Sequence, residues 1–370
     1  MKQTTNIFIL GLGLLLTACS SGELPDTDNA TVAFRPDFHT GETQTRSIVN
    51  STSTTTAGGA INEVNVYVTK KDGKAIYPGT ETTNGVVTFT KQADNTWKGK
   101  VNLHSEMARI YAYYPTSITT PTLGGSNVNG SGDIDTHYIT ITPLADQTFD
   151  GTNDWNCSTV DYLYGTRTNP EDASAIEANN QTDKGGLNPS IYLQHALAQV
   201  AFTMKTAPDR PLTDYDYIKK ITIKAAGNDY TPFAIAAHML LKDGTLNSTT
   251  NVAQLTFTPT GESGNGTGST AVKCGEEKAP ALVGYGLVAP LSDPPATGTI
   301  KISVLLGAKG SDNTNERELT ATLENPTQWL KGKRYVYPIT LTNLAITVGK
   351  TTITEWVQID SGSDMKPDGI

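Results

Sequence analysis

Short runs of alternating apolar and polar residues recur along most of the chain and predict β-strands. Val64, Val66 and Val68 alternate with polar neighbours, and Lys71-Asp72-Gly73-Lys74 then predicts a turn. Further runs before residue 145 lie at 86–89, 97–103, 110–114 and 138–141. Gly, Pro and Asn separate these short strands, which favours an antiparallel sandwich over a parallel sheet with crossover helices. We expect the strand at 64–68 to be buried on one face only.

A polar stretch at residues 169–189 interrupts this pattern and predicts a linker or a long loop between two domains. A second series of strands follows, at 196–204, 218–224, 253–257, 282–288, 300–306, 318–323, 335–341, 344–348 and 353–359. Two further segments are open to a helical interpretation, at 171–178 and 326–330, and residues 234–241 fit a strand or a helix. Residues 258–268 are rich in Gly and Thr and predict an exposed loop.

The first nineteen residues differ from the rest of the chain. Lys2 is followed by an apolar run at 7–16, which is shorter than the ~20 residues that a membrane-spanning helix needs and is typical of a secretory signal peptide. The run ends in Leu16-Thr17-Ala18-Cys19, which resembles a bacterial lipobox, where the thiol is diacylated and becomes the new N-terminus. The alternative is an ordinary signal peptide with an incidental cysteine. We therefore expect residues 1–18 to be removed and Cys19 to anchor the chain in a membrane.

Length and charge restrict the domain count and the partners. Removing 18 of the 370 residues leaves 352, which suits two domains of about 150 residues each. The chain has 28 basic and 37 acidic residues, a net charge of −9, and no basic patch with interleaved aromatic residues, so nucleic acid is a poor partner. After Cys19 only Cys157 and Cys274 remain, and their spacing leaves open whether they pair or stay as buried thiols.

Candidate chemistry is sparse, and we expect neither an enzyme nor a bound metal or cofactor. The histidines do not occur at metal or triad spacings, and His195, which opens an expected strand, fits a structural role better than that of a base. Asp133 and Asp135 resemble a calcium loop only faintly, because the other acidic ligands are missing. Four tryptophans could line a sugar platform, although isolated tryptophans in sandwiches are usually core residues; they are Trp97, Trp155, Trp329 and Trp356.

Several short motifs occur in one order over nearly the whole chain. They are Cys19 in its lipobox, Thr31-Val32-Ala33-Phe34, Thr45-Arg46-Ser47, residues 61–68, the aromatic strand 110–115, residues 161–166, residues 193–200, residues 335–341 and Ile353-Thr354-Glu355-Trp356. Each is weak alone, but in this order they resemble the fimbrillin family, the lipoprotein precursors of pilus subunits in a group of anaerobic Gram-negative bacteria.

The resemblance implies an all-β fold with two tandem transthyretin-like Greek-key β-sandwich domains, and a route of assembly. In such precursors the first strand, here Thr31, Val32, Ala33 and Phe34, completes the N-terminal sheet. An Arg-specific surface protease cuts in the following loop, and the vacated groove accepts a C-terminal strand from a neighbouring subunit. The implied division is a signal peptide at 1–18, a propeptide at 19–46, an N-terminal domain at 47–185 and a C-terminal domain at 186–370.

The residues fit this scheme at both ends of the chain. Arg46 and Ser47 lie in a polar segment typical of a protease-accessible loop, whereas cleavage at the competing Arg35 is disfavoured because Pro36 follows it. At the other end Ile353, Val357 and Ile359 share one face of the candidate donor strand with Glu355, while Trp356 lies on the other face or marks a bulge. The alternative is a last strand that packs on its own sheet.

The leading hypothesis is therefore a structural pilus subunit that supports adhesion. Its expected partners are other pilus subunits in a homo- or heteropolymer, an Arg-specific surface protease and, through Cys19, outer-membrane lipid in the precursor. The mature form would reside in the cell-surface fimbrium, with stalk, tip or accessory rank left open. The alternative is a surface glycan-binding lipoprotein of a polysaccharide-uptake system. A secreted hydrolase would need a carboxylate pair or a nucleophile that the sequence does not reveal.

Overall fold

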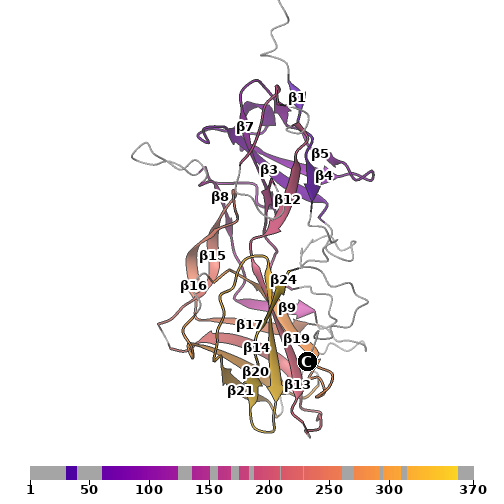
Figure 1. The fold of residues 1–370 in the computed structure, drawn as a ribbon, viewed down its shortest axis with the longest axis vertical. Coiled ribbons are helices and arrows are strands. Elements are labelled where there is room, and N and C mark those ends of the chain that lie inside the picture. The colour runs from indigo at the N-terminus through magenta and orange to yellow at the C-terminus, as the bar shows by residue number, and fades with distance from the viewer. Residues whose placement is uncertain are drawn as a thin grey trace, which may run out of the picture.

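The computed structural model describes residues 31–39, 61–123, 136–150, 157–167, 175–182, 187–208, 210–227, 229–260, 271–291, 295–309 and 315–356. Strands dominate these residues, and the all-β class expected from the sequence is confirmed. Figure 1 shows one group of strands at one end of the long axis, including β1, β3, β4, β5, β7 and β12, and a second group at the other end. We call these groups the N-terminal lobe and the C-terminal lobe.

One mixed sheet forms the N-terminal lobe. Its described strands run in the order β2 (Asp37–His39), β12 (Ser190–His195), β10 (Leu163–Thr166), β7 (Ala108–Tyr114), β3 (Glu63–Lys70), β4 (Val86–Lys91) and β5 (Trp97–Lys98), with β11 (Ile176–Ala178) also on β7. A short ladder joins β1 (Val32–Ala33) to β6 (Asn102–Leu103), and a 3₁₀ turn η2 covers Pro78–Thr80. The N-terminal lobe therefore combines its first strands, β1 and β2, with β12, which follows much later in the chain.

The central strand β3 is buried on both faces, so the expectation of a half-buried strand is wrong. Val64, Val66 and Val68 belong to an apolar cluster within the N-terminal lobe. Tyr67, on the opposite face, belongs to the larger cluster that continues through the C-terminal lobe. Asn65 is also fully buried, and its side-chain amide donates hydrogen bonds of 3.0 Å to the backbone carbonyls of residues 116 and 118. The alternation of Val with polar residues therefore marks two different packed faces.

Two sheets enclose the core of the C-terminal lobe. One contains β19 (Ala281–Val288), β13 (Ala198–Thr206), β22 (Lys333–Leu341), β23 (Ile346–Val348) and β24 (Thr352–Glu355), where β23 and β24 both pair with β22. The other contains β21 (Arg317–Thr322), β20 (Ile300–Gly307), β14 (Tyr217–Ala225), β17 (Gln254–Thr260) and β9 (Asp146–Asp150), with β18 (Val272–Lys273) on β14. Phe202 on β13 lies 5.3 Å from Phe257 on β17, ring centre to ring centre, and so joins the two sheets.

A three-stranded sheet of β16 (Leu246–Val252), β15 (Phe233–Leu240) and β8 (Tyr138–Ile141) lies between the two groups of strands in Figure 1. The ambiguous segment 234–241 is therefore mostly a strand. The helical interpretation that residues 326–330 left open does not hold for those described residues, where Trp329 instead makes an isolated bridge to Leu291.

Strands do not follow the order of the two expected domains. β8 and β9 precede residue 185 yet pair with β15 and β17, whereas β12 follows it and pairs with β10. The stretch at 169–189 also contains β11, where Ile176 and Ala178 are buried against β7, so the expectation of a polar loop or a helix there is wrong for residues 176–178. The boundary at 185 and 186 stays a prediction, as does the Greek-key description of each domain.

Most neighbouring strands are antiparallel, but three described pairs are parallel: β13 with β22, β9 with β17 and β2 with β12. The first of these extends over eight residue pairs. The expectation of antiparallel pairing therefore holds for most of the fold but not for these three ladders. The parallel pair of β2 with β12 holds the first described segment, residues 31–39, in the N-terminal lobe.

Candidate functional site

The first described segment, residues 31–39, lies in the N-terminal lobe as an inserted strand. Phe34, Pro36 and Phe38 are buried, while Ala33, Arg35 and Asp37 between them are exposed. This alternation has the period of an extended strand with one face turned to the core. The expected first strand at Thr31, Val32, Ala33 and Phe34 is therefore the first half of a longer insertion that includes β1 and β2.

Main-chain hydrogen bonds hold this segment on two sides. On one side Val32 and Ala33 pair with β6, and the Phe34 N–H donates to the carbonyl of Val101 at 2.9 Å. On the other side the N–H groups of residues 35 and 37 donate to the carbonyls of residues 187 and 189, at 3.1 and 3.0 Å, before β2 pairs with β12. Residues 31–39 thus link β6 to β12.

Two aromatic side chains anchor the segment from within. The Phe34 and Phe38 rings lie 6.2 and 5.9 Å from the Phe89 ring, and Phe38 lies 4.9 Å from Trp97, all edge to face. We call Phe89 and Trp97, with the flanking segments 101–103 and 187–192, the N-terminal slot. Each buried phenylalanine contributes roughly 1.5–3 kcal/mol, so non-covalent contacts hold the strand firmly but reversibly.

The glycine at residue 99 leaves room for this arrangement. A side-chain carbon at Gly99 would lie 2.6 Å from the Phe89 ring, closer than packed atoms allow. The absence of a side chain there lets Phe89 lie where it contacts both inserted rings. Gly99 therefore leaves the space that the Phe89 ring occupies in the N-terminal slot.

At the other end of the described chain, β24 lies on the edge of its sheet. It pairs with residues 333–336 of β22, and its four side chains are exposed, Ile353 by 50%. Glu355 forms an ion pair with Lys333, also at the surface. In this state the segment packs on its own sheet, which was the alternative to donor use, and it does so with little buried side-chain surface.

Trp356 is the exception, because it is buried and ends the described chain. Its backbone N–H donates to the carbonyl of Gly332 at 3.0 Å, and its ring stacks on His195 with 3.9 Å between ring centres. The Nδ1 atom of His195 lies 2.9 Å from a carboxylate oxygen of Asp161, which is completely buried. Burial raises the pKa of Asp161, while the contact with His195 acts in the opposite direction. These contacts support a structural role for His195.

Several predicted site residues lie outside the described residues. They are Cys19, Arg46, Ser47, Val357 and Ile359, together with Asp133, Asp135 and Trp155. The structure therefore brings together the first strand with its slot, and Trp356 with His195. Lipidation, cleavage and the end of the candidate donor strand stay predictions.

The remaining candidate chemistry is buried. Cys157 and Cys274 are buried thiols that are not joined in a disulfide, and burial raises the pKa of each to about 12. Trp97, Trp329 and Trp356 are each at most 9% exposed, so none presents a ring face to a polysaccharide. No group of three potential metal ligands occurs among the described residues, and no described helix has the length and apolarity to cross a membrane.

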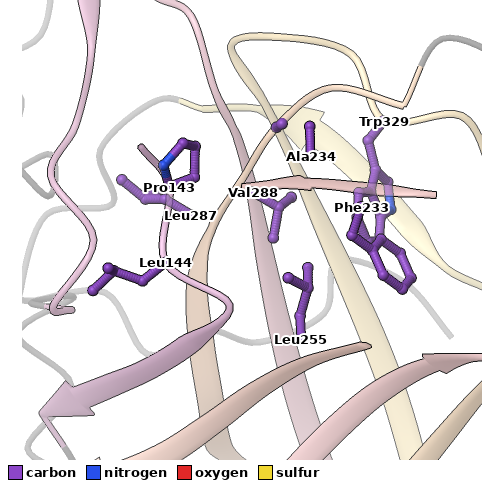
Figure 2. Close-up of a pocket in the computed structure, with 9 residues that line it drawn as sticks. Pro143, Leu144, Phe233, Ala234, Leu255, Leu287, Val288 and Trp329 are labelled. Carbon is purple, nitrogen blue, oxygen red and sulfur yellow. The ribbon is translucent and has the colours of Figure 1, made fainter. Parts of the chain in front are cut away.

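An apolar depression lies in the C-terminal lobe, on the side near β15. Figure 2 shows Pro143 and Leu144 on one side of it and Phe233 with Trp329 on the other, and these two rings stack 5.7 Å apart. Its lining residues include no titratable side chain, so it offers no acid–base chemistry.

Two features of the site escaped the reasoning from sequence. The expected first strand ended at Phe34, yet Pro36 also occupies an inward, buried position of the inserted segment. The alternation of Phe34, Pro36 and Phe38 was the signal that could have revealed it. The contact between Asp161 and His195 joins residues 34 positions apart, and no local pattern encodes it.

Comparison with known proteins gives a family and a fold. A family model described as fimbrillin-like matches residues 45–356. A solved fimbrial protein from Bacteroides vulgatus ATCC 8482 is 15% identical, with a TM-score of 0.55 over 89% of this chain and 100% of that chain. Cell adhesion proteins from Bacteroides ovatus ATCC 8483 and Bacteroides uniformis ATCC 8492 are 15% and 14% identical, with TM-scores of 0.48 and 0.46.

These two matches cover 90% and 88% of this chain and 100% and 99% of the solved chains. At such identities the similarity to the Bacteroides vulgatus protein shows the fold alone. No curated protein sequence matches the chain.

Proposed function

Because the chain belongs to the fimbrillin-like family, we propose that it is a structural subunit of a cell-surface pilus. It is exported as a lipoprotein precursor, with Cys19 carrying the lipid at the outer membrane. An Arg-specific surface protease cuts between Arg46 and Ser47, and residues 31–39 then leave the N-terminal slot. The C-terminal strand of a neighbouring subunit replaces them, and repetition of this step builds the fimbrium.

One observation carries the proposal: residues 31–39 fill the N-terminal slot as an inserted strand. Its inward row is apolar and buried, its outward row is exposed, and main-chain hydrogen bonds hold it on both sides. Such a strand can be exchanged for another extended segment, because the main-chain bonds are independent of sequence and only the inward side chains must fit. The polar sequence around Arg46 places the proposed cut between this strand and β3.

The C-terminal end supports the donor half of the proposal. β24 adheres to β22 through four residue pairs with exposed side chains, and one buried ring secures its end. A strand held in this way can detach without exposing much of its own core. Residues 353–359, with Ile353, Trp356, Val357 and Ile359, are the proposed donor segment.

The alternative, a glycan-binding surface lipoprotein, receives no comparable support. Its expected platform of tryptophans is not available at three of the four positions, because Trp97, Trp329 and Trp356 are buried. Exposed aromatic residues do occur, at Tyr215 and Tyr230, but they are 45% and 38% exposed and are not paired in a ring contact in the described structure.

The test is a pair of arginine substitutions in the producing bacterium. Arg46→Ala is expected to leave the lipoprotein precursor longer than the mature form by residues 19–46, which is 28 residues, on immunoblots, and to abolish fibres in electron micrographs. Arg35→Ala, at an exposed position followed by Pro36, is the matched control and should cleave and assemble normally. Normal fibres from the Arg46→Ala strain would contradict the cleavage site, and normal fibres with the precursor uncut would contradict maturation by proteolysis.

A further inference from the structure

The inserted strand defines what the N-terminal slot accepts. Its three inward positions, 34, 36 and 38, are successive members of one face of an extended strand. The outer two are phenylalanines that are 1% and 6% exposed, and both touch the ring of Phe89. An occupant in the same pleat must therefore supply large apolar side chains at two positions four residues apart, with an uncharged residue between them.

A charged side chain does not fit this row. The inward positions belong to the apolar cluster of the lobe, which also contains Trp97 and Leu103. The Phe89 ring, which both outer side chains contact, has no hydrogen-bond donor for a carboxylate. A carboxylate placed in this apolar row would lose its water, and Phe89 would give it no partner in return.

The chain's own candidate donor segment does not meet this requirement. On one face of residues 353–359 the order is Ile353, Glu355, Val357 and Ile359, and every set of three successive positions on that face contains Glu355. On the other face Thr354 and Gln358 flank Trp356, so both outer positions are polar. Reversing the direction of the strand changes neither result.

We propose that the N-terminal slot selects a strand with large apolar side chains at positions i and i+4, and that this strand comes from a different pilus subunit and not from residues 353–359 of a second copy. This inference rests on the proposed strand replacement and narrows it to a heteropolymeric joint at this end of the subunit. Residues 353–359 then serve a neighbour whose slot tolerates a polar inward residue.

Peptide binding to the cleaved protein tests the selection. The chain expressed without residues 1–19 is cut with an Arg-specific protease, the released segment is removed by a mild urea step, and its loss is checked by mass spectrometry. Four labelled peptides are then compared by fluorescence anisotropy: residues 31–39, the same peptide with Phe34→Ser and Phe38→Ser, residues 351–359, and the same peptide with Glu355→Phe.

We expect residues 31–39 to rebind, and the doubly substituted peptide to bind at least about a hundredfold more weakly, because two buried rings are lost. Residues 351–359 should bind at least about tenfold more weakly than residues 31–39, and Glu355→Phe should recover about tenfold by placing an apolar ring four residues before Ile359.

The possible results separate the two claims. If the unchanged 351–359 peptide binds as tightly as residues 31–39, the selection is overturned while strand replacement stands. Equal binding of the two versions of the 31–39 peptide also overturns the selection. If residues 31–39 are not released after cleavage, or if the emptied protein binds none of the four peptides, strand replacement itself fails and the selection fails with it.

Discussion

Asp216 is a buried carboxylate that has two nearby partners, Arg210 and Thr213, and one distant partner, Arg317. Two oxygens accept hydrogen bonds from Arg210 at 2.9 and 2.7 Å, and Arg317 adds a third at 3.0 Å. The backbone N–H and hydroxyl of Thr213 complete the site at 2.8 and 3.0 Å. Burial alone would raise the pKa of Asp216, but the hydrogen bonds from Arg210 and Thr213 outweigh it and hold the pKa below its ordinary value.

A depressed carboxylate pKa stabilises the folded state at pH values above the ordinary value of about 3.9, and this contribution disappears as the pH falls toward the folded-state pKa. Asp216→Asn should therefore lower the free energy of unfolding at pH 7 by about 3–5 kcal/mol, because Arg210 keeps its charge without its partner. As the pH falls below 4, the free energy of unfolding should decrease less in the variant than in the unchanged protein. Urea unfolding at pH 7 and pH 3 measures both effects.

Asp214→Asn is the matched control for this prediction, because Asp214 lies two residues away and is exposed. It should change the free energy of unfolding by less than about 0.5 kcal/mol at either pH. A comparable loss in both variants at pH 7 would show that the carboxylate of Asp216 is not the source of the stability.

The two buried thiols allow a second prediction at the scale of single residues. With a pKa of about 12, each of Cys157 and Cys274 is a thiolate in about one molecule in ten thousand at pH 8, and burial also keeps reagents away. The folded chain expressed without residues 1–19 should therefore gain no iodoacetamide adduct in an hour, and two adducts in urea. Mass spectrometry counts the adducts, and any adduct on the folded chain would contradict the burial of that thiol.

At the scale of the element, β24 depends on the one buried ring at its end. Its four side chains are exposed, and its backbone pairs with β22 alone among the described strands. The stack of Trp356 on His195 is thus the main side-chain contact that holds it. Such a strand opens locally at a small fraction of the global free energy of unfolding.

Removing that ring should therefore release the strand without unfolding the lobe. In Trp356→Ala, we expect hydrogen exchange at residues 352–355 to accelerate about 10–100-fold, which corresponds to about 1.4–2.8 kcal/mol, while β13 stays protected. Ile353→Ala, at a half-exposed position of the same strand, serves as the control and should exchange as the unchanged protein does. Measurement is by hydrogen–deuterium exchange and mass spectrometry, and equal exchange in both variants would remove Trp356 as the anchor.

The elements that the sequence did not predict have physical reasons in common. β16 reads Leu246-Asn247-Ser248-Thr249-Thr250-Asn251-Val252. Among the described strands it pairs only with β15, and its five middle residues are polar and exposed, so no apolar alternation marks it. In β9 the inward residues are Gln147 and Phe149. The Gln147 side-chain amide donates to the backbone carbonyl of Leu287 and accepts from its N–H. A polar side chain thus occupies an inward position of β9, where the expected alternation would place an apolar one.

At the scale of the whole molecule, the sequence was most informative where a strand packs on one clear core. The strands expected at 218–224, 300–306 and 335–341 correspond to β14, β20 and β22, which line the core of the C-terminal lobe. The strand pairing could not be predicted from the sequence, because β9 and β12 pair with strands in the other half of the chain. The family resemblance indicated a replaceable first strand, but the contacts of Phe38 with Phe89 and Trp97 needed the three-dimensional arrangement.

β12 touches both ends of the proposed joint between subunits. Its residues 190–192 pair with β2 in the slot, and His195, three residues further on, lies under Trp356. An extended chain covers those three residues in about 10 Å. Before assembly this short stretch contacts both segments, so in the proposed scheme emptying the slot and detaching residues 353–359 would each remove a contact from β12.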